Sequence, residues 1–269
     1  MPQSSEHGLR RSLTADPAFG PLGALLLMLT VVTGVVDAVS ILALGRVFVA
    51  NMTGNVVFAS FAIVGAPGFS LSASLFALAG FLAGAYGGGL LIERSRRDRG
   101  SLLRAGTAVE FALAAVALVI AALSGAPGAS HGTIGLSGGS FGPAVTDAVA
   151  ALLAVAMGTQ NAVASKLAVP DLTTTVLTRT LAGLGADLHV VLRGTGRGSP
   201  ARAAARTDLG RRLLAVAATV AGAAVGAALV LHVSAVAALA LATALLAVTA
   251  IAAAAAARRP AAWRTPAPK

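Results

Sequence analysis

Gly34-Val-Val-Asp37-Ala-Val-Ser40 lies within the first strongly apolar run, and Asn51-Met-Thr-Gly-Asn55 follows just beyond its end. Both stretches have a counterpart in the second half of the chain, in Gly158-Thr-Gln-Asn161-Ala-Val-Ala164 and Thr174-Thr-Val-Leu-Thr-Arg-Thr180. The first pair matches at four residues with one spacing of 124 positions, and Thr53 matches Thr178 at 125. Polar, glycine-containing breaks in apolar sequence, repeated once per half, are typical of the discontinuous helices of membrane transporters.

The composition places the chain in a membrane. Of its 269 residues, 57% are hydrophobic and 11% are charged, which is more apolar surface than one soluble core needs. The net charge of +10 comes from arginines clustered between apolar runs, so it predicts membrane orientation instead of nucleic-acid binding. The absence of cysteine excludes disulfides, thiolate metal sites and thiol catalysis. The apolar run after Arg11 is too long for a signal peptide and predicts a retained first span.

The distribution of arginine decides between two topologies. Six apolar runs are long enough to cross a hydrocarbon core of about 30 Å, namely 22–44, 70–92, 105–124, 143–167, 213–232 and 234–257. The runs 51–65 and 172–191 are ambiguous, because both begin with polar residues. Eight full spans put the two arginine-rich loops, 93–104 and 193–212, on opposite sides, whereas six spans put both loops and both termini in the cytoplasm. We therefore predict an all-α polytopic membrane protein with six transmembrane helices and two re-entrant half-helices.

Three spans per half make the two halves inverted repeats. The predicted organisation is a cytoplasmic N-terminal tail (1–20), a first membrane repeat (21–124), an external Gly-rich loop (125–142), a second membrane repeat (143–257) and a basic cytoplasmic tail (258–269). One glycine stripe falls on the second span of each half and predicts close helix packing. The residues of these stripes are Gly80, Gly84, Gly88, Gly222 and Gly226.

The chain resembles the YoaK-like family of uncharacterised bacterial inner-membrane proteins. The resemblance is carried by Gly34-x-x-Asp37-Ala with Asn51-Met-Thr-Gly-Asn55, and by Met157-Gly-x-Gln160-Asn161-Ala with Thr174-Thr-Val-Leu-Thr178. It extends over most of the chain, roughly Leu22 to Ala257. Members of this family usually have glycine after the second-half threonine, where this chain has Arg179. The resemblance implies a polytopic membrane protein and brings no established activity with it.

Asp37 is the leading candidate for a functional residue. An acid inside a span costs about 2.5–3.5 kcal/mol, so it should face the bundle interior or a wet cavity, with a partner or a proton. The alternative is a structural hydrogen bond that holds the first half-helix turn. Asn161, its neutral counterpart, serves either a ligand or the structure through its amide. Glu110 and Asp147 fall near the ends of predicted spans, which favours solvated or salt-bridged roles over a part in a proton relay.

The starts of the two half-helices are the second candidate feature. Two helix N-termini facing each other at mid-membrane present positive dipole ends to an anion or a polar solute. The alternative is simple N-capping by threonine and asparagine. Arg179 either attracts an anion or anchors the chain at the membrane interface. The predicted substrate- or ion-binding residues are Asp37, Asn51, Thr53, Gly54, Asn55, Gln160, Asn161, Thr175, Thr178 and Arg179.

The function predicted from these features is that of a secondary transporter or permease for a small polar or anionic solute. Its expected surroundings are the lipid bilayer of the bacterial inner membrane, with the solute and protons as candidate partners. A channel-like pore and a non-transporting structural or partner-binding role are the alternatives. No enzyme is predicted, because no Ser/His, paired-acid or metal-binding motif is present, and neither metal nor cofactor is expected. The sequence identifies neither the substrate nor the oligomeric state.

Overall fold

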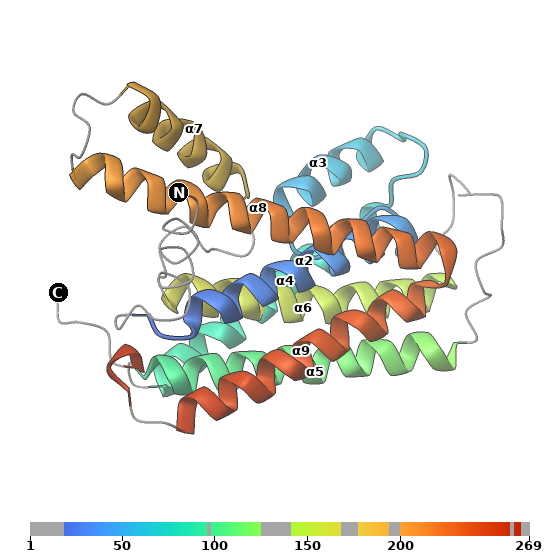
Figure 1. Cartoon of the computed structure of the whole chain (residues 1–269). Coiled ribbons are helices and arrows are strands. Elements are labelled where there is room, and N and C mark those ends of the chain that lie inside the picture. Colours follow the sequence, from blue (N-terminus) through green and yellow to red (C-terminus); the bar gives the residue numbers. More distant parts are fainter. Residues whose placement is uncertain are drawn as a thin grey trace.

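The computed structural model describes eight α-helices and one short 3₁₀ helix within residues 19–95, 98–124, 141–167, 177–193, 200–258 and 261–264 (Figure 1). Nearly all of the predicted N-terminal tail and of the Gly-rich loop, together with Thr175, lies outside these residues. The helices are α2 (Leu22–Ala43), α3 (Met52–Ile63), α4 (Leu71–Arg94), α5 (Arg99–Leu123), α6 (Pro143–Leu167), α7 (Leu177–Arg193), α8 (Pro200–His232), α9 (Ala235–Arg258) and η1 (Ala262–Arg264).

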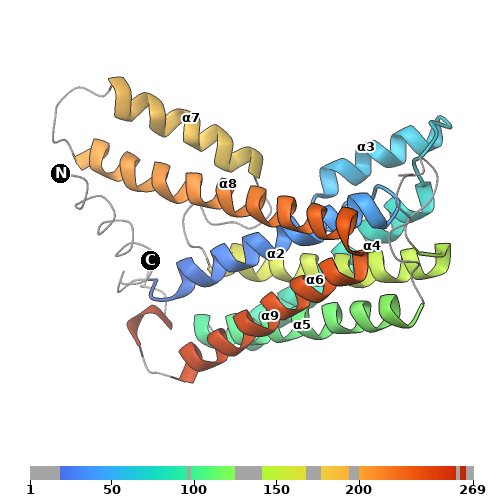
Figure 2. The ribbon, with the colours of Figure 1, turned by 45° about the vertical axis from the view of Figure 1, so that its right-hand side comes forward.

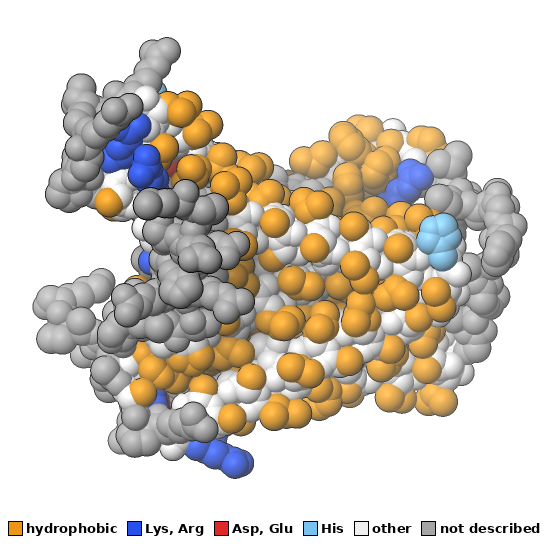
Figure 3. All heavy atoms as spheres, in the orientation of Figure 1, with side chains coloured by type: hydrophobic (Ala, Val, Ile, Leu, Met, Phe, Trp, Pro, Cys, Tyr) orange, Lys and Arg blue, Asp and Glu red, His pale blue; other side chains and the backbone are white. Residues whose placement is uncertain are grey.

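Six of these helices, α2, α4, α5, α6, α8 and α9, are long and apolar enough to cross a membrane. They have 22 to 33 residues, and a crossing takes about 20. Their outward faces are apolar as well, because Leu82 and Ile251 expose 68% and 70% of their surface. Figure 3 shows these apolar side chains over the length of the bundle, with Lys and Arg gathered mainly at one end. Such a surface is suited to lipid and unsuited to water.

Two crossings of long helices form the centre of the fold. The most extensive contacts join α2 to α8 and α4 to α6, and α5 packs against both α6 and α9. All of these pairs link the first half of the chain to the second. Within a half, the short helices pack against their neighbours, α3 on α4 and α7 on α8.

The first crossing depends on glycine. A β-carbon on Gly34 of α2 would lie 2.7 Å from the backbone nitrogen of Ala223 in α8, which no real contact allows. In return, Gly222 of α8 faces the backbone of Val31, and Gly226 faces Val35 with 2.9 Å between its built β-carbon and the Val35 Cα atom. The absence of side chains lets the two backbones touch, as in other small-residue crossings of membrane helices.

The second crossing repeats the first. A β-carbon on Gly158 of α6 would lie 2.9 Å from the backbone nitrogen of Ala85 in α4. Gly84 of α4 faces Val155, and Gly88 faces the β-carbon of Ala162 at 2.7 Å. Adding 124 to the residue numbers of α2 gives their counterparts in α6, and adding 138 to those of α4 gives their counterparts in α8. With these two shifts, each contact of the second crossing corresponds to a contact of the first. Gly80 contacts α6 as well, beside Ala151.

The two short helices begin near the middle of the bundle and run to opposite ends of it (Figures 1 and 2). α3 has 12 residues and α7 has 17, which correspond to about 18 and 25 Å. α7 is held to α8 by an ion pair of 2.9 Å between Arg212 and Asp187 and by a hydrogen bond from Arg202 to the Val191 carbonyl. α3 instead has an aromatic contact, with the Phe48 and Phe58 rings 5.5 Å apart.

Two helices begin earlier than the sequence pattern predicts. The stretch 93–104 is predicted as a loop, but Asp98 accepts a hydrogen bond of 3.0 Å from the Gly100 backbone nitrogen and starts α5 at Arg99. The stretch 193–212 is also predicted as a loop, but α8 begins at Pro200. Proline at the first helical position, followed by alanine and arginine, favours helix there.

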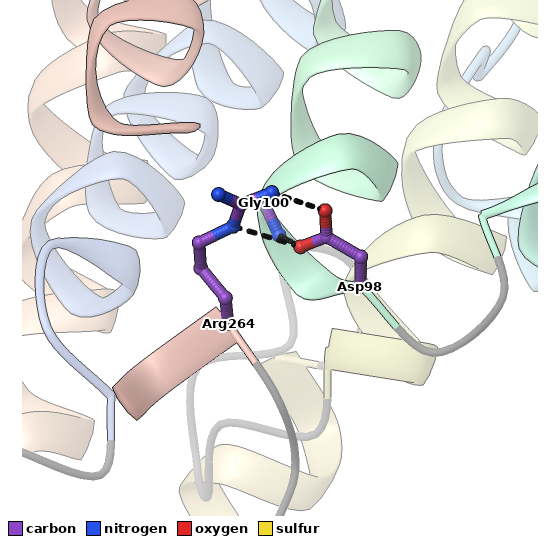
Figure 4. A network of polar contacts seen from close by, with 3 residues as sticks. All are labelled: Asp98, Gly100 and Arg264. Atoms are coloured by element: carbon purple, nitrogen blue, oxygen red, sulfur yellow. Dashed lines mark hydrogen bonds and ion pairs between the residues drawn. The ribbon is translucent and has the colours of Figure 1, made fainter. Parts of the chain in front are cut away.

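The C-terminal segment closes one end of the bundle. Trp263 of η1 is buried, and the β-carbon of a side chain at Gly20, just before α2, would collide with its indole ring. Arg264 donates two hydrogen bonds to the Asp98 carboxylate (Figure 4). This arginine holds the pKa of Asp98 below its ordinary value. We call Gly20, Asp98, Trp263 and Arg264 the terminal clasp, because they tie the start of α2, the start of α5 and the segment after α9 together.

Candidate functional site

The site is built around a sharp reversal of the chain after α2. α2 ends at Ala43, and the next residues Gly45 and Arg46 both have positive φ angles, 80° and 59°. Glycine adopts this left-handed conformation without a steric cost, whereas an arginine there is uncommon. The reversal sends 47–51 back along α2, with Val47, Val49 and Ala50 buried.

Asp37 faces this returning segment. Its carboxylate accepts a hydrogen bond from the backbone N–H of Ala50, at the residue before the cap of α3. The Oδ1 atom of the same carboxylate is buried and has no hydrogen-bond partner. The Ala50 N–H therefore fits the structural role that the sequence left open for Asp37. Oδ1 is a buried acceptor without a partner.

Asn55 serves the backbone of the returning segment. Its side-chain oxygen accepts from the Phe48 backbone nitrogen at 2.8 Å, and its amide donates to the Phe48 carbonyl. The side chain is fully buried. Gly54 is required at its position because a β-carbon would collide with the Phe48 ring. These two predicted binding residues therefore fix the shape of the turn.

Asn51 and Thr53 remain available to a ligand. Both are exposed at the start of α3. Asn51 occupies the N-cap position but makes no side-chain hydrogen bond to the helix, so the simple capping role is not realised by this residue. The N–H groups of a first helical turn that lack a side-chain cap attract negative charge or polar oxygen atoms.

The second half contributes residues from α6 and α7. Gln160 of α6 is fully buried and donates from its amide nitrogen to the Thr33 hydroxyl of α2 at 2.9 Å, while its Oε1 atom has no hydrogen-bond partner. Asn161 is half-buried beside it. Thr178 and Arg179 are exposed in the first turn of α7. The structure thus brings Gln160 to α2 one helical turn from Asp37, which is four residues beyond Thr33.

Glu110 is a residue whose surroundings differ from the predicted solvated or salt-bridged ones. It is predicted near a span end in a solvated or salt-bridged role, but it is fully buried near the centre of the 25-residue helix α5. Neither of its carboxylate oxygens has a hydrogen-bond partner. The error follows from the start of α5, since the cap at Asp98 adds six residues before the predicted span. An aspartate followed by a helix-forming run is a signal that would have revealed this start.

In the part of the chain that the structure describes, no group of three or more His, Asp or Glu side chains lies close enough together to hold an ion. The chemistry available at the site is hydrogen bonding, helix-dipole attraction and proton exchange by carboxylates.

Comparison with known proteins identifies a family and a relative of this chain. The family model described as a protein of unknown function (DUF1275) matches residues 25–252. The UPF0700 transmembrane protein YoaK of Bacillus subtilis (strain 168) is 32% identical over 166 residues, which are 61% of this chain and 66% of that protein. The match thus spans just under two thirds of the length of this relative. No solved structure matches the chain significantly.

Proposed function

The chain belongs to the protein family of unknown function DUF1275, and from this premise we propose that it is a secondary transporter or permease for a small polar or anionic solute. It is a multi-pass membrane protein, with six apolar helices and a transmembrane relative. The observation that carries the proposal is the pair of short helices that start near the middle of the bundle, one of them beside the free oxygen of Asp37.

The proposed architecture is a pair of inverted repeats, α2 to α5 and α6 to α9. The equivalent glycine contacts at spacings of 124 and 138 positions support a repeat. An odd number of spans per repeat supports inversion, and α2 and α6 run in opposite directions in Figure 1. Inverted repeats with a site between them are the usual basis of alternating access in secondary transporters.

In this proposal α3 and α7 are re-entrant half-helices. Neither is long enough to cross about 30 Å of hydrocarbon, and each returns toward the end at which the preceding long helix finished. Orientation follows from charge. Arg94, Arg99, Lys166 and Arg258 lie at the ends of α4, α5, α6 and α9 that share one side of the bundle. The excess of basic residues supports a cytoplasmic location for this side, on which α2 begins and α9 ends.

The solute would be bound where the two half-helices begin. The uncapped first turn of α3 offers N–H groups, Thr53 and Thr178 offer hydroxyls, and Arg179 adds a positive charge near the start of α7. Asp37 would exchange a proton on its free Oδ1 atom as the solute enters or leaves. An intramembrane acid at such a place is typical of proton-linked transport.

The test exploits the absence of native cysteine. Single Thr53→Cys and Thr178→Cys variants are labelled with a membrane-impermeant thiol reagent, from outside in intact cells and from inside in inverted vesicles. We expect both cysteines to be labelled, because both side chains are exposed and would line a water-filled pathway. A cysteine at buried Thr243 serves as the unlabelled control. Failure at both positions in well-expressed protein contradicts the transport proposal, and labelling from both sides at once favours a channel.

A further inference from the structure

Glu110 is an acid that the proposed solute site does not use. Its side chain is fully buried in the middle of α5, and both of its oxygens lack a donor. An ionised carboxylate in such a place costs many kcal/mol, so a protein keeps the group neutral or pairs it. No pairing is present, because Glu110 forms no ion pair or hydrogen bond with any described residue.

No charged side chain offers compensation from the surrounding helices. The described titratable groups on the elements that pack against α5, and on α5 itself, are Asp147, Lys166, Arg258, Tyr86, Glu93, Arg94, Arg264, Arg99 and Arg104. Most of these lie in the end turns of their helices, whereas Glu110 lies at the centre of its own. Lys166 is exposed, and Arg264 is bound to Asp98.

Helix geometry places the polar side chain of Gln160, on α6, at the level of Glu110. Gly106 of α5 lies against Val163 of α6, with 3.1 Å between its built β-carbon and a Val163 methyl group. Because α5 and α6 run in opposite directions (Figure 1), one turn from this contact leads to Glu110 on α5 and to Gln160 on α6. Gln160 has an Oε1 atom that is buried and lacks a donor. The two carboxylate oxygens of Glu110 and the Oε1 atom of Gln160 are therefore three buried hydrogen-bond acceptors at one level of the bundle, and none of them receives a donor.

The second half shows that packing alone does not require an acid here. Thr107 of α5 and Thr243 of α9 each donate to the carbonyl four residues earlier, at 2.9 and 2.8 Å. The two threonines are 136 positions apart. The same spacing makes Leu246 of α9 the counterpart of Glu110, and Leu246 is also fully buried. The fold accepts an apolar side chain in the equivalent place.

We propose that Glu110 is a proton-binding site, protonated in this conformation, whose hydroxyl donates to Gln160 Oε1. The proton then continues a buried hydrogen-bond chain, since Gln160 donates to Thr33 and Thr33 donates to the Leu29 carbonyl. Release of the proton requires that α5 move away from α6 and admit water. This inference rests on the proposed transport function for its purpose, because it makes Glu110 the site that couples proton movement to helix movement.

Infrared spectroscopy of the purified full-length protein at neutral pH tests the protonation directly. A protonated carboxylic acid has a carbonyl stretching band separate from that of a carboxylate. We expect this band in the wild type and its loss in Glu110→Gln, with the Glu110 band retained in Asp37→Asn. Glu110→Leu is the second variant, which copies Leu246 and keeps the test valid if the glutamine variant does not fold. Wild-type and variant spectra that coincide in this region overturn the proposal.

Two further results distinguish a proton site at Glu110 from a sodium site, and this inference from the transport proposal. Loss of the wild-type band on adding sodium chloride, but not potassium chloride, would show a sodium site and overturn the assignment to a proton. The infrared band does not depend on transport. If the cysteines at 53 and 178 stay unlabelled while the band is present, the transport proposal fails and the protonated Glu110 stands. If the cysteines are labelled and the band is missing, the transport proposal stands and the protonation of Glu110 is overturned.

Discussion

At the scale of single residues, the site contains a carboxylate, that of Asp37, with one buried oxygen that accepts no hydrogen bond. Asp37 accepts from the Ala50 N–H and leaves Oδ1 without a partner. Its counterpart in the second half is Asn161, which has the same shape and no proton to exchange. Both halves thus carry a side-chain oxygen at this position, and under the proposed function the acid of Asp37 serves proton exchange.

Asp37→Asn separates these two roles. We expect this variant to insert and unfold like the wild type, because the amide oxygen still accepts from Ala50, and to lose the pH dependence of solute uptake. Asp37→Ala leaves the Ala50 N–H without an acceptor and should lower the free energy of unfolding by about 1–3 kcal/mol. Thermal unfolding and uptake into liposomes measure both effects. An active Asp37→Asn variant with unchanged pH dependence contradicts a proton role for this residue.

Residue identity alone singled out Asp37 as a candidate, and its functional role stays a prediction, but residue identity could not assign the surroundings of Asn55 or Glu110. Asn55 looks like a ligand-binding amide, yet it binds the Phe48 backbone, because the returning segment needs partners for its N–H and carbonyl groups inside an apolar bundle. Glu110 was expected near the end of a span because the hydropathy pattern marks the apolar run from 105, whereas the helix begins earlier, at Arg99. Both depend on where the chain turns, which no local pattern states.

At the scale of helices, the two glycine crossings are the feature that the sequence predicted best. The spacing of glycine every four residues on α4 and α8 implied a flat helix face, and both faces meet a partner backbone. The partner was not predictable from the stripe, because a small-residue face fits any helix that approaches closely. The ion pair that holds α7 to α8 was also not foreseen, since Arg212 was expected in a loop.

Gly84→Ala and Gly222→Ala test the equivalence of the crossings. Each added β-carbon would collide with a carbonyl of the facing helix, at Val155 or at Val31. Overpacking of this kind costs about 1–3 kcal/mol, and we expect similar losses of thermal stability in both variants. Gly89→Ala is the matched control on α4, because nothing lies within 4 Å of its built β-carbon. A Gly84→Ala protein as stable as this control would contradict the close crossing.

At the scale of the whole molecule, the terminal clasp joins segments from both ends of the chain. Trp263 packs on Gly20, and Arg264 binds Asp98, so the start of α2 and the start of α5 are held by the residues that follow α9. The clasp lies on the basic side of the bundle. Its state can be read without a label, because Trp263 is the single tryptophan of the chain.

The clasp should open in acid. Arg264 lowers the pKa of Asp98 in the folded protein, so the ion pair contributes stability above the ordinary aspartate pKa of 3.8 and loses it as the pH falls through the lower folded value. We expect the fluorescence of Trp263 to shift to longer wavelength in that range, and in Asp98→Asn already at neutral pH. Asp208→Asn, which removes an ion pair with Arg211 on α8, is the control. Identical emission of Asp98→Asn and wild type would show that the clasp does not depend on this pair.

The interleaving of the two halves also sets an order of events during synthesis. α2 and α4 make their most extensive contacts with α8 and α6, which leave the ribosome later. Until then the glycine faces of the first half have only lipid beside them, and Glu110 has no Gln160 nearby. The first four helices therefore enter the membrane as an unfinished assembly that must remain open until translation of the second half supplies its partners. A chain that ends after residue 124 should be inserted but unfolded, and digestible by a protease that spares the complete protein.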